Sequence, residues 1–83
     1  MNTKYSEPAI AFRKSTYSRY AGLRDKRNMR DADVSKSTGI SKSTISDWKN
    51  GKCIPKWDKM MCIAELFEMP IGVFISYLTN KGV

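Results

Sequence analysis

The chain of 83 residues contains no histidine, and its two cysteines, Cys53 and Cys62, are nine positions apart. A structural zinc site usually needs four Cys or His ligands, so these residues argue against one. Without histidine, acid-base or nucleophilic catalysis would depend on eight scattered carboxylates, and no Gly-rich phosphate loop is present. We therefore expect no enzyme, no metal and no cofactor. Cys62 lies in an apolar segment and is expected to fill part of a core.

Long apolar runs are also missing. No segment approaches the ~20 apolar residues of a membrane-spanning helix, and the first eight residues, MNTKYSEP, are too polar for a signal peptide. We therefore expect a cytoplasmic protein without a membrane partner. The hydrophobic content of 41%, with three Phe, four Tyr and two Trp, is enough for one small packed domain.

Positive charge is present in excess and is unevenly distributed. The formal net charge is +7, to which residues 1–30 contribute +6, residues 31–59 contribute +2 and residues 60–83 contribute −1. Such a distribution favours a polyanionic partner for the first two segments. A basic surface that only aids solubility is the alternative interpretation.

Composition divides the chain into three parts. Residues 1–15 are polar, are interrupted by Pro8, and are expected to form a mobile basic arm that carries Lys4, Arg13 and Lys14. Residues 16–80 are expected to form the folded domain, and residues 81–83 a C-terminal tail. We expect removal of the arm to leave the fold intact and to weaken binding of a polyanion.

Apolar residues recur at helical spacing, and no strand-like alternation appears. The expected helices cover residues 16–26, 31–38, 42–49, 56–67 and 70–78. The second and third are short and are separated by Gly39, which suits a left-handed turn, and by Ser41, which suits a helix N-cap. The residues expected to pack between these two helices are Val34, Ile45 and Trp48. This pattern is typical of a helix-turn-helix.

Further residues at matching spacings surround this unit. They are Leu23, Arg24, Val34, Ser35, Gly39, Ile40, Ser41, Ile45, Asp47, Trp48, Asn50, Gly51, Lys52, Pro55, Ile63, Ala64, Phe67, Ile71 and Phe74. The ordered set, within residues 17–78, resembles the Cro and repressor type (XRE-like) of helix-turn-helix family. Its members include phage repressors, bacterial regulators and some antitoxins. The resemblance implies an all-α five-helix bundle containing a helix-turn-helix, that is, a lambda-repressor-like DNA-binding domain.

The resemblance also implies how the domain would meet DNA, with the helix at 42–49 in the major groove. The positions expected to contact bases are Ser41, Lys42, Ser43 and Asp47. The positions expected to contact phosphates are Arg24, Thr44, Asn50 and Lys52. Alternatives stay open for three of these residues. Lys42 could be a solvated charge, Asp47 could repel phosphates or pair with a lysine, and Asn50 could also act as a helix stop.

Three positions depart from the family pattern. Lys49 stands where the family often has an acidic partner for Arg24, so Arg24 is expected to be freer to meet DNA. Arg30 and Asp31 stand where the family often has a Ser or Thr cap followed by Gln, and Asp31 would repel a nearby phosphate. Glu68 replaces the usual glycine after the fourth helix, which predicts an altered turn or a strained residue.

The sequence thus predicts a sequence-specific regulator of transcription that binds double-stranded DNA, of phage or bacterial repressor type. The alternative is a protein-interaction module or an antitoxin with the same fold. Trp48 is expected to pack in the core rather than to stack on bases, and Trp57 to cover the core edge. Exposed apolar residues among Val73, Ile75 and Tyr77 could form a homodimer surface on the C-terminal helix, or be ordinary surface residues.

Overall fold

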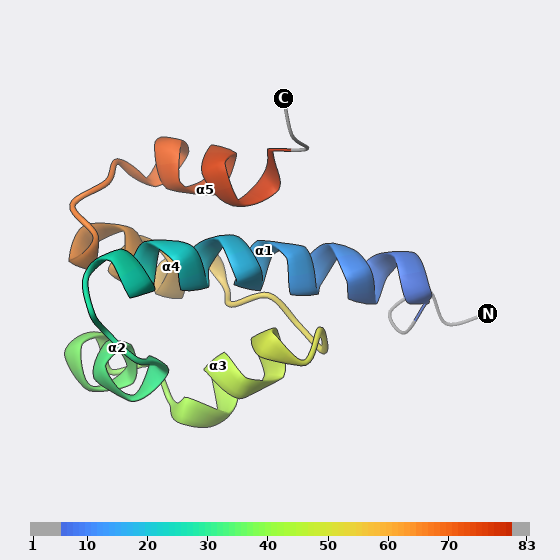
Figure 1. Cartoon of the computed structure of the whole chain (residues 1–83), viewed down its shortest axis with the longest axis horizontal. Helices are drawn as coiled ribbons and strands as arrows, with labels where there is room; N and C mark the ends of the chain where they lie inside the picture. Colours follow the sequence, from blue (N-terminus) through green and yellow to red (C-terminus); the bar gives the residue numbers. More distant parts are fainter. Residues whose placement is uncertain (1–5, 81–83) are drawn as a thin grey trace.

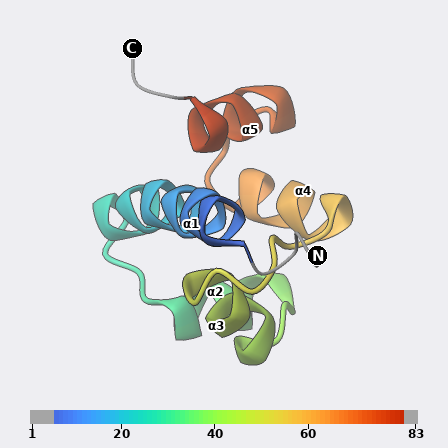
Figure 2. The same cartoon turned by 90° about the vertical axis from the view of Figure 1, so that its right-hand side faces the viewer.

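The computed structural model describes residues 6–80, which form five α-helices. In chain order they are α1 (Glu7–Lys26), α2 (Asp31–Thr38), α3 (Lys42–Lys49), α4 (Trp57–Leu66) and α5 (Ile71–Thr79). The long helix α1 runs through the middle of the molecule, with α2 and α3 on one side of it and α5 on the other (Figure 1). Figure 2 shows α4 beside α1, between the same two layers. The expected all-α helix-turn-helix fold is confirmed.

One hydrophobic core joins all five helices. Its buried members are Tyr17, Tyr20, Val34, Ile40, Ile45, Trp48, Met60, Ile63, Ala64, Phe67, Phe74 and Leu78. Trp48 lies at its centre with no exposed surface, and its ring centroid is 4.7 Å from that of Tyr20. The core role expected for Trp48 is therefore confirmed. Trp57 is 58% exposed, which is compatible with its expected place at the core edge. Cys62 is exposed, so the core role expected for it is wrong.

The helix-turn-helix has the expected boundaries and turn. Gly39 ends α2 with φ +80°, a left-handed conformation that glycine adopts at little cost. Ser41 precedes α3, and its hydroxyl accepts a hydrogen bond of 3.2 Å from the backbone N–H of Thr44. This N-cap satisfies one of the amides that the start of a helix leaves without a backbone partner.

The first helix begins earlier than the sequence suggested. The expected start at residue 16 is wrong, because α1 also includes residues 7–15, most of the expected arm. Ser6 caps this helix through a 3.3 Å hydrogen bond from the N–H of Ala9. Pro8 lies in the first turn, where the missing N–H of proline costs nothing. The other expected arm residues, 1–5, and the tail, 81–83, lie outside the described residues.

The turn after α4 contains a strained residue at Glu68, which is one of the two outcomes expected there. This residue has φ +57°, in the left-handed region that costs a residue with a Cβ about 1 kcal/mol. Asn28, after α1, has φ +56°, which asparagine tolerates better. The side chain of Arg27 connects the end of α1 to the end of α4. Its Nη2 donates a hydrogen bond to the carbonyl of Phe67 at 2.8 Å and lies 3.7 Å from the carboxylate of Glu68.

No single helix within residues 6–80 is both long and apolar enough to cross a membrane. Only α4 and α5 taken together reach that length and composition, as a pair bent by 102°.

Candidate nucleic-acid interface

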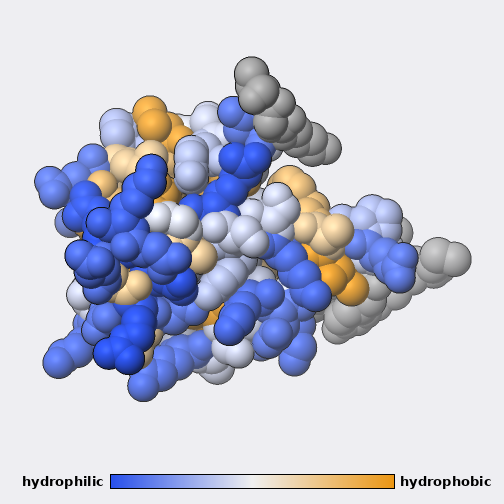
Figure 3. All heavy atoms as spheres, viewed as in Figure 1, coloured by the Kyte–Doolittle hydropathy of each residue, from blue (hydrophilic) through white to orange (hydrophobic). Residues whose placement is uncertain are grey.

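Helix α3 has one face in the core and one face in solvent. Ile45 and Trp48 are buried, whereas Ser41, Lys42 and Ser43 are exposed. The side of the molecule that carries α2 and α3 is largely hydrophilic in the view of Figure 3. The structure therefore brings three of the expected base-contacting residues together at the start of α3, on its outer face.

The hydroxyl groups at the start of α3 form a small cluster. The Oγ atom of Ser41 lies 2.8 Å from Thr44 Oγ1 and 3.2 Å from Ser43 Oγ, both within hydrogen-bonding distance. These contacts hold the first turn in place and give Thr44 a partner inside the protein. Lys42 makes no ion pair within residues 6–80, so its charge remains available to a ligand.

Asp47, the fourth expected base-contacting residue, lies further along α3. It is half-buried, and its carboxylate makes no ion pair with any residue between 6 and 80. The alternative in which Asp47 pairs with a lysine is therefore not seen in the described part of the chain. Its backbone carbonyl accepts a 2.8 Å hydrogen bond from the N–H of Lys52.

The loop after α3 begins at Asn50 and turns at Gly51. Asn50 ends the helix, its N–H donating to the carbonyl of Ser46 at 3.0 Å, and Gly51 follows with φ +76°. Asn50 and Lys52 are exposed while Gly51 between them is buried. The helix-stop role proposed for Asn50 is thus present, and it leaves the side chain on the surface.

Arg24 has acidic partners, which corrects the expectation that it is freer to meet DNA. Its Nη1 donates to Asp31 at 2.7 Å and its Nη2 to Asp25 at 2.9 Å, and its side chain is 17% exposed. The carboxylate that balances Arg24 comes from the start of α2, because Lys49 cannot supply one. The departures at positions 49 and 31 therefore compensate each other.

Asp31 collects hydrogen bonds from α1. The hydroxyl groups of Tyr17 and Tyr20 donate to its carboxylate at 2.6 Å and 2.8 Å, in addition to Arg24. The Asp31 charge is therefore balanced within the fold, which weakens the expected repulsion of a phosphate. Sequence reasoning missed this cluster, although Tyr17, Tyr20 and Arg24 are spaced i, i+3 and i+7 along one helix face.

The same cluster shifts the ionisation of its members. Burial alone would raise the pKa of Asp31, but hydrogen bonds from Tyr17, Arg24 and Tyr20 outweigh burial and hold that pKa below its ordinary value. Burial, followed by the hydrogen bond to Asp31, raises the pKa of Tyr17 and that of Tyr20. At neutral pH the cluster therefore contains a carboxylate, a guanidinium and two protonated phenols.

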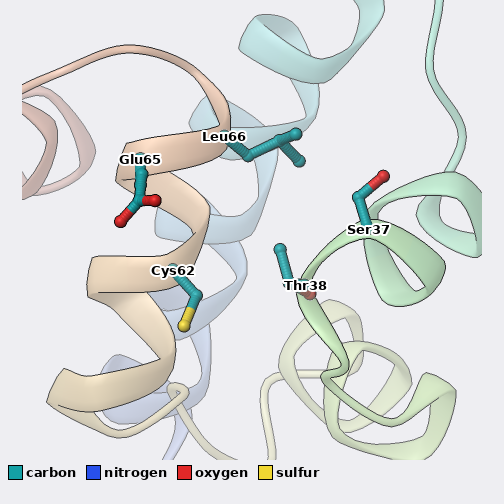
Figure 4. A pocket seen from close by; sticks show the side chains of 5 residues that line it. All are labelled: Ser37, Thr38, Cys62, Glu65 and Leu66. Atoms are coloured by element: carbon teal, nitrogen blue, oxygen red, sulfur yellow. The ribbon is translucent and has the colours of Figure 1, made fainter.

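A surface pocket of about 400 Å³ lies between the end of α2 and α4 (Figure 4). Its lining residues are Ser37, Thr38, Cys62, Glu65 and Leu66. Within residues 6–80 no group of three or more Cys, Asp or Glu residues is placed to hold a metal ion. We assign no chemistry to this pocket.

A comparison with known protein families identifies the family of this chain. The family model described as the Cro/C1-type HTH DNA-binding domain matches residues 22–79, which span the end of α1 and all of α2 to α5. This is a non-enzymatic family. No curated protein and no solved structure matches the chain. Because this family model matches most of the chain, the chain belongs to the Cro/C1-type helix-turn-helix family of DNA-binding domains.

Proposed function

We propose that this protein is a sequence-specific transcriptional regulator of phage or bacterial repressor type that places α3 in the major groove of double-stranded DNA. One observation carries the proposal. The first turn of α3 exposes Ser41, Lys42 and Ser43, while Ile45 and Trp48 anchor the opposite face in the core. A rigidly held helix with polar groups at its exposed start is suited to reading base edges.

The proposed base contacts follow from donor and acceptor chemistry. Lys42 donates to guanine O6 and N7, and the hydroxyl groups of Ser41 and Ser43 donate or accept according to the base. The carboxylate of Asp47 accepts a hydrogen bond from the N4 amino group of cytosine if DNA reaches the middle of α3. Since Ser41 also caps the helix, its hydroxyl contributes less freely to recognition than Ser43.

The proposed phosphate contacts lie beside the reading helix. Lys52 supplies a charge and Asn50 a neutral hydrogen bond from the loop after α3, and Thr44 adds a hydroxyl from α3 itself. Arg24 is a weaker candidate, because its guanidinium already bonds to Asp25 and Asp31. We therefore assign the main charge contact of this group to Lys52.

The test is a selection of preferred sites from random duplexes, followed by a mobility assay of the parent on the selected duplex and on a scrambled duplex. Lys42→Ala should cost about 1–3 kcal/mol on the selected duplex and relax preference at one base position. Lys52→Ala should weaken binding about equally on both duplexes and lower the slope of log affinity against log salt by about 1.

Asn50→Ala is the matched control, because a neutral side chain releases no counterion. Its affinity should fall while the salt slope stays nearly constant. Equal weakening of Lys42→Ala on both duplexes would make Lys42 a phosphate contact instead. A parent protein that binds no duplex would refute the proposal and favour a protein-interaction module or an antitoxin with this fold.

We propose further that two copies bind a near-palindromic site, with α5 as the dimer surface. Val73 and Tyr77 are one helical turn apart on α5 and are 55% and 37% exposed. Ile75, also considered for this surface, is half-buried against the core. Val73→Asp should leave the fold intact and shift sedimentation velocity from dimer to monomer. A monomeric parent at the concentrations used for binding would refute the dimer.

A further inference from the structure

The first half of α1 reaches the loop that follows α3. Residues 7–21 of this helix precede the segment matched by the family model, which starts at residue 22. Figures 1 and 2 show this part of α1 beside the connection from α3 to α4. The extension therefore lies next to the loop to which we assign the phosphate contacts.

Three side chains of the extension surround Gly51. Arg13 Nη1 donates a 3.0 Å hydrogen bond to the Gly51 carbonyl. A Cβ added to Gly51 would lie 2.8 Å from Ile10 Cγ2 and 3.1 Å from Lys14 Cγ. Glycine is thus required here both by its positive φ and by close packing. These contacts fix the position of the loop relative to α1.

Lys14 combines this placement with an exposed charge. Its stem passes beside Gly51, and beyond Cγ it continues through two methylene groups to the ammonium. Lys14 and Lys52 are both exposed, and neither makes an ion pair within residues 6–80. Two lysines beside one loop, neither of them in an ion pair within the described part of the chain, raise the local positive potential, which a phosphate group would neutralise.

We infer that Lys14 is an additional contact to the DNA backbone, supplied by the extension of α1 and acting beside Lys52. The inference rests on the proposed docking of α3 and adds to it a residue outside the segment that the family model matches. Such a contact is independent of base sequence, because it involves phosphate oxygens only.

The experiment compares Lys14→Gln with Lys26→Gln in a salt titration on the selected and scrambled duplexes. Glutamine keeps most of the aliphatic stem beside Gly51 and removes the charge. Lys14→Gln should lower affinity about tenfold near 0.1 M salt on both duplexes and reduce the salt slope by about 1 per protomer. Lys26→Gln is the matched control, since Lys26 is an exposed lysine in the last turn of the same helix. It should leave both quantities unchanged.

The charge-retaining variant Lys14→Arg separates charge from packing and should keep the parental slope. The thermal midpoint of each variant shows whether the helix is intact. Parental affinity and slope in Lys14→Gln, with Lys52→Ala still impaired, would overturn the inference and leave the proposed function standing. Equal losses in Lys14→Gln and Lys26→Gln would also overturn it, because total charge would then explain both. A parent that binds no duplex would refute the proposed function itself.

Discussion

The indole Nε1 of Trp48 donates a 2.8 Å hydrogen bond to Oγ1 of Thr16 in the middle of α1. Both side chains are buried, and the Thr16 hydroxyl in turn donates to the carbonyl of Arg13 at 2.7 Å. Trp48 is fully buried, so this bond ties the inner face of α3 to α1. It also connects α3 to the residue that bonds Gly51.

Thr16→Val should destabilise the fold. Valine has nearly the shape of threonine but leaves the buried indole N–H without an acceptor, at a cost of about 1–3 kcal/mol in unfolding free energy. Denaturant unfolding measures this cost. Thr16→Ser keeps the hydroxyl and should lose less than Thr16→Val. The reverse order would show that the methyl group, and not the hydrogen bond, is what matters at this position.

Gly51→Ala should cost more than Gly39→Ala. Both glycines have φ near +80°, so both variants carry the left-handed penalty of about 1 kcal/mol. Only at Gly51 does the added methyl group meet other atoms, those of Ile10 and Lys14. Thermal unfolding of the pair isolates the packing of α1 on the loop. Equal midpoints would mean that the loop moves away from α1 at little cost.

Removal of residues 1–15 should lower stability as well as affinity. This revises the expectation drawn from the sequence, because the deletion removes the Ser6 cap, the Ile10 packing and the Arg13 bond to Gly51. We expect a loss of at least about 1 kcal/mol in a domain that remains helical. Circular dichroism and thermal unfolding provide the measurement. A midpoint equal to that of the full chain would show that the contacts of this segment add nothing to stability.

Stability should fall in acid through Asp31. Its folded pKa lies below the ordinary value, so its contribution is present above about pH 4 and is lost as pH falls through the folded pKa. Asp31→Asn should lose about 1.5–3 kcal/mol at neutral pH and show a shallower decline between about pH 5 and 2. Asp58→Asn is the control, because Asp58 is exposed and unpaired within residues 6–80. Parallel pH curves for parent and Asp31→Asn would contradict the assignment.

Local sequence was enough for the elements that depend on local interactions. The bounds of α2 and α3 were predicted to the residue, and Gly39 and Ser41 were assigned their turn and cap roles. Apolar spacing predicted that Trp48 packs in the core, and comparison with the family pattern, which has glycine at the position of Glu68, predicted a strained residue there. The helix bounds, the turn and the cap depend on residues within a few positions along the chain, and so can be predicted from spacing and residue type.

Only the tertiary structure decided the features that join distant segments. Pro8 appeared to interrupt the chain, yet residues 7–15 are helical and pack on a loop some forty positions further on. Arg24 appeared to lack an acidic partner, yet the start of α2 supplies Asp31. Cys62 lies in an apolar segment but faces outward. In each case, the way α1 packs against the other helices selects the contacts, and helical spacing within one segment cannot specify that packing.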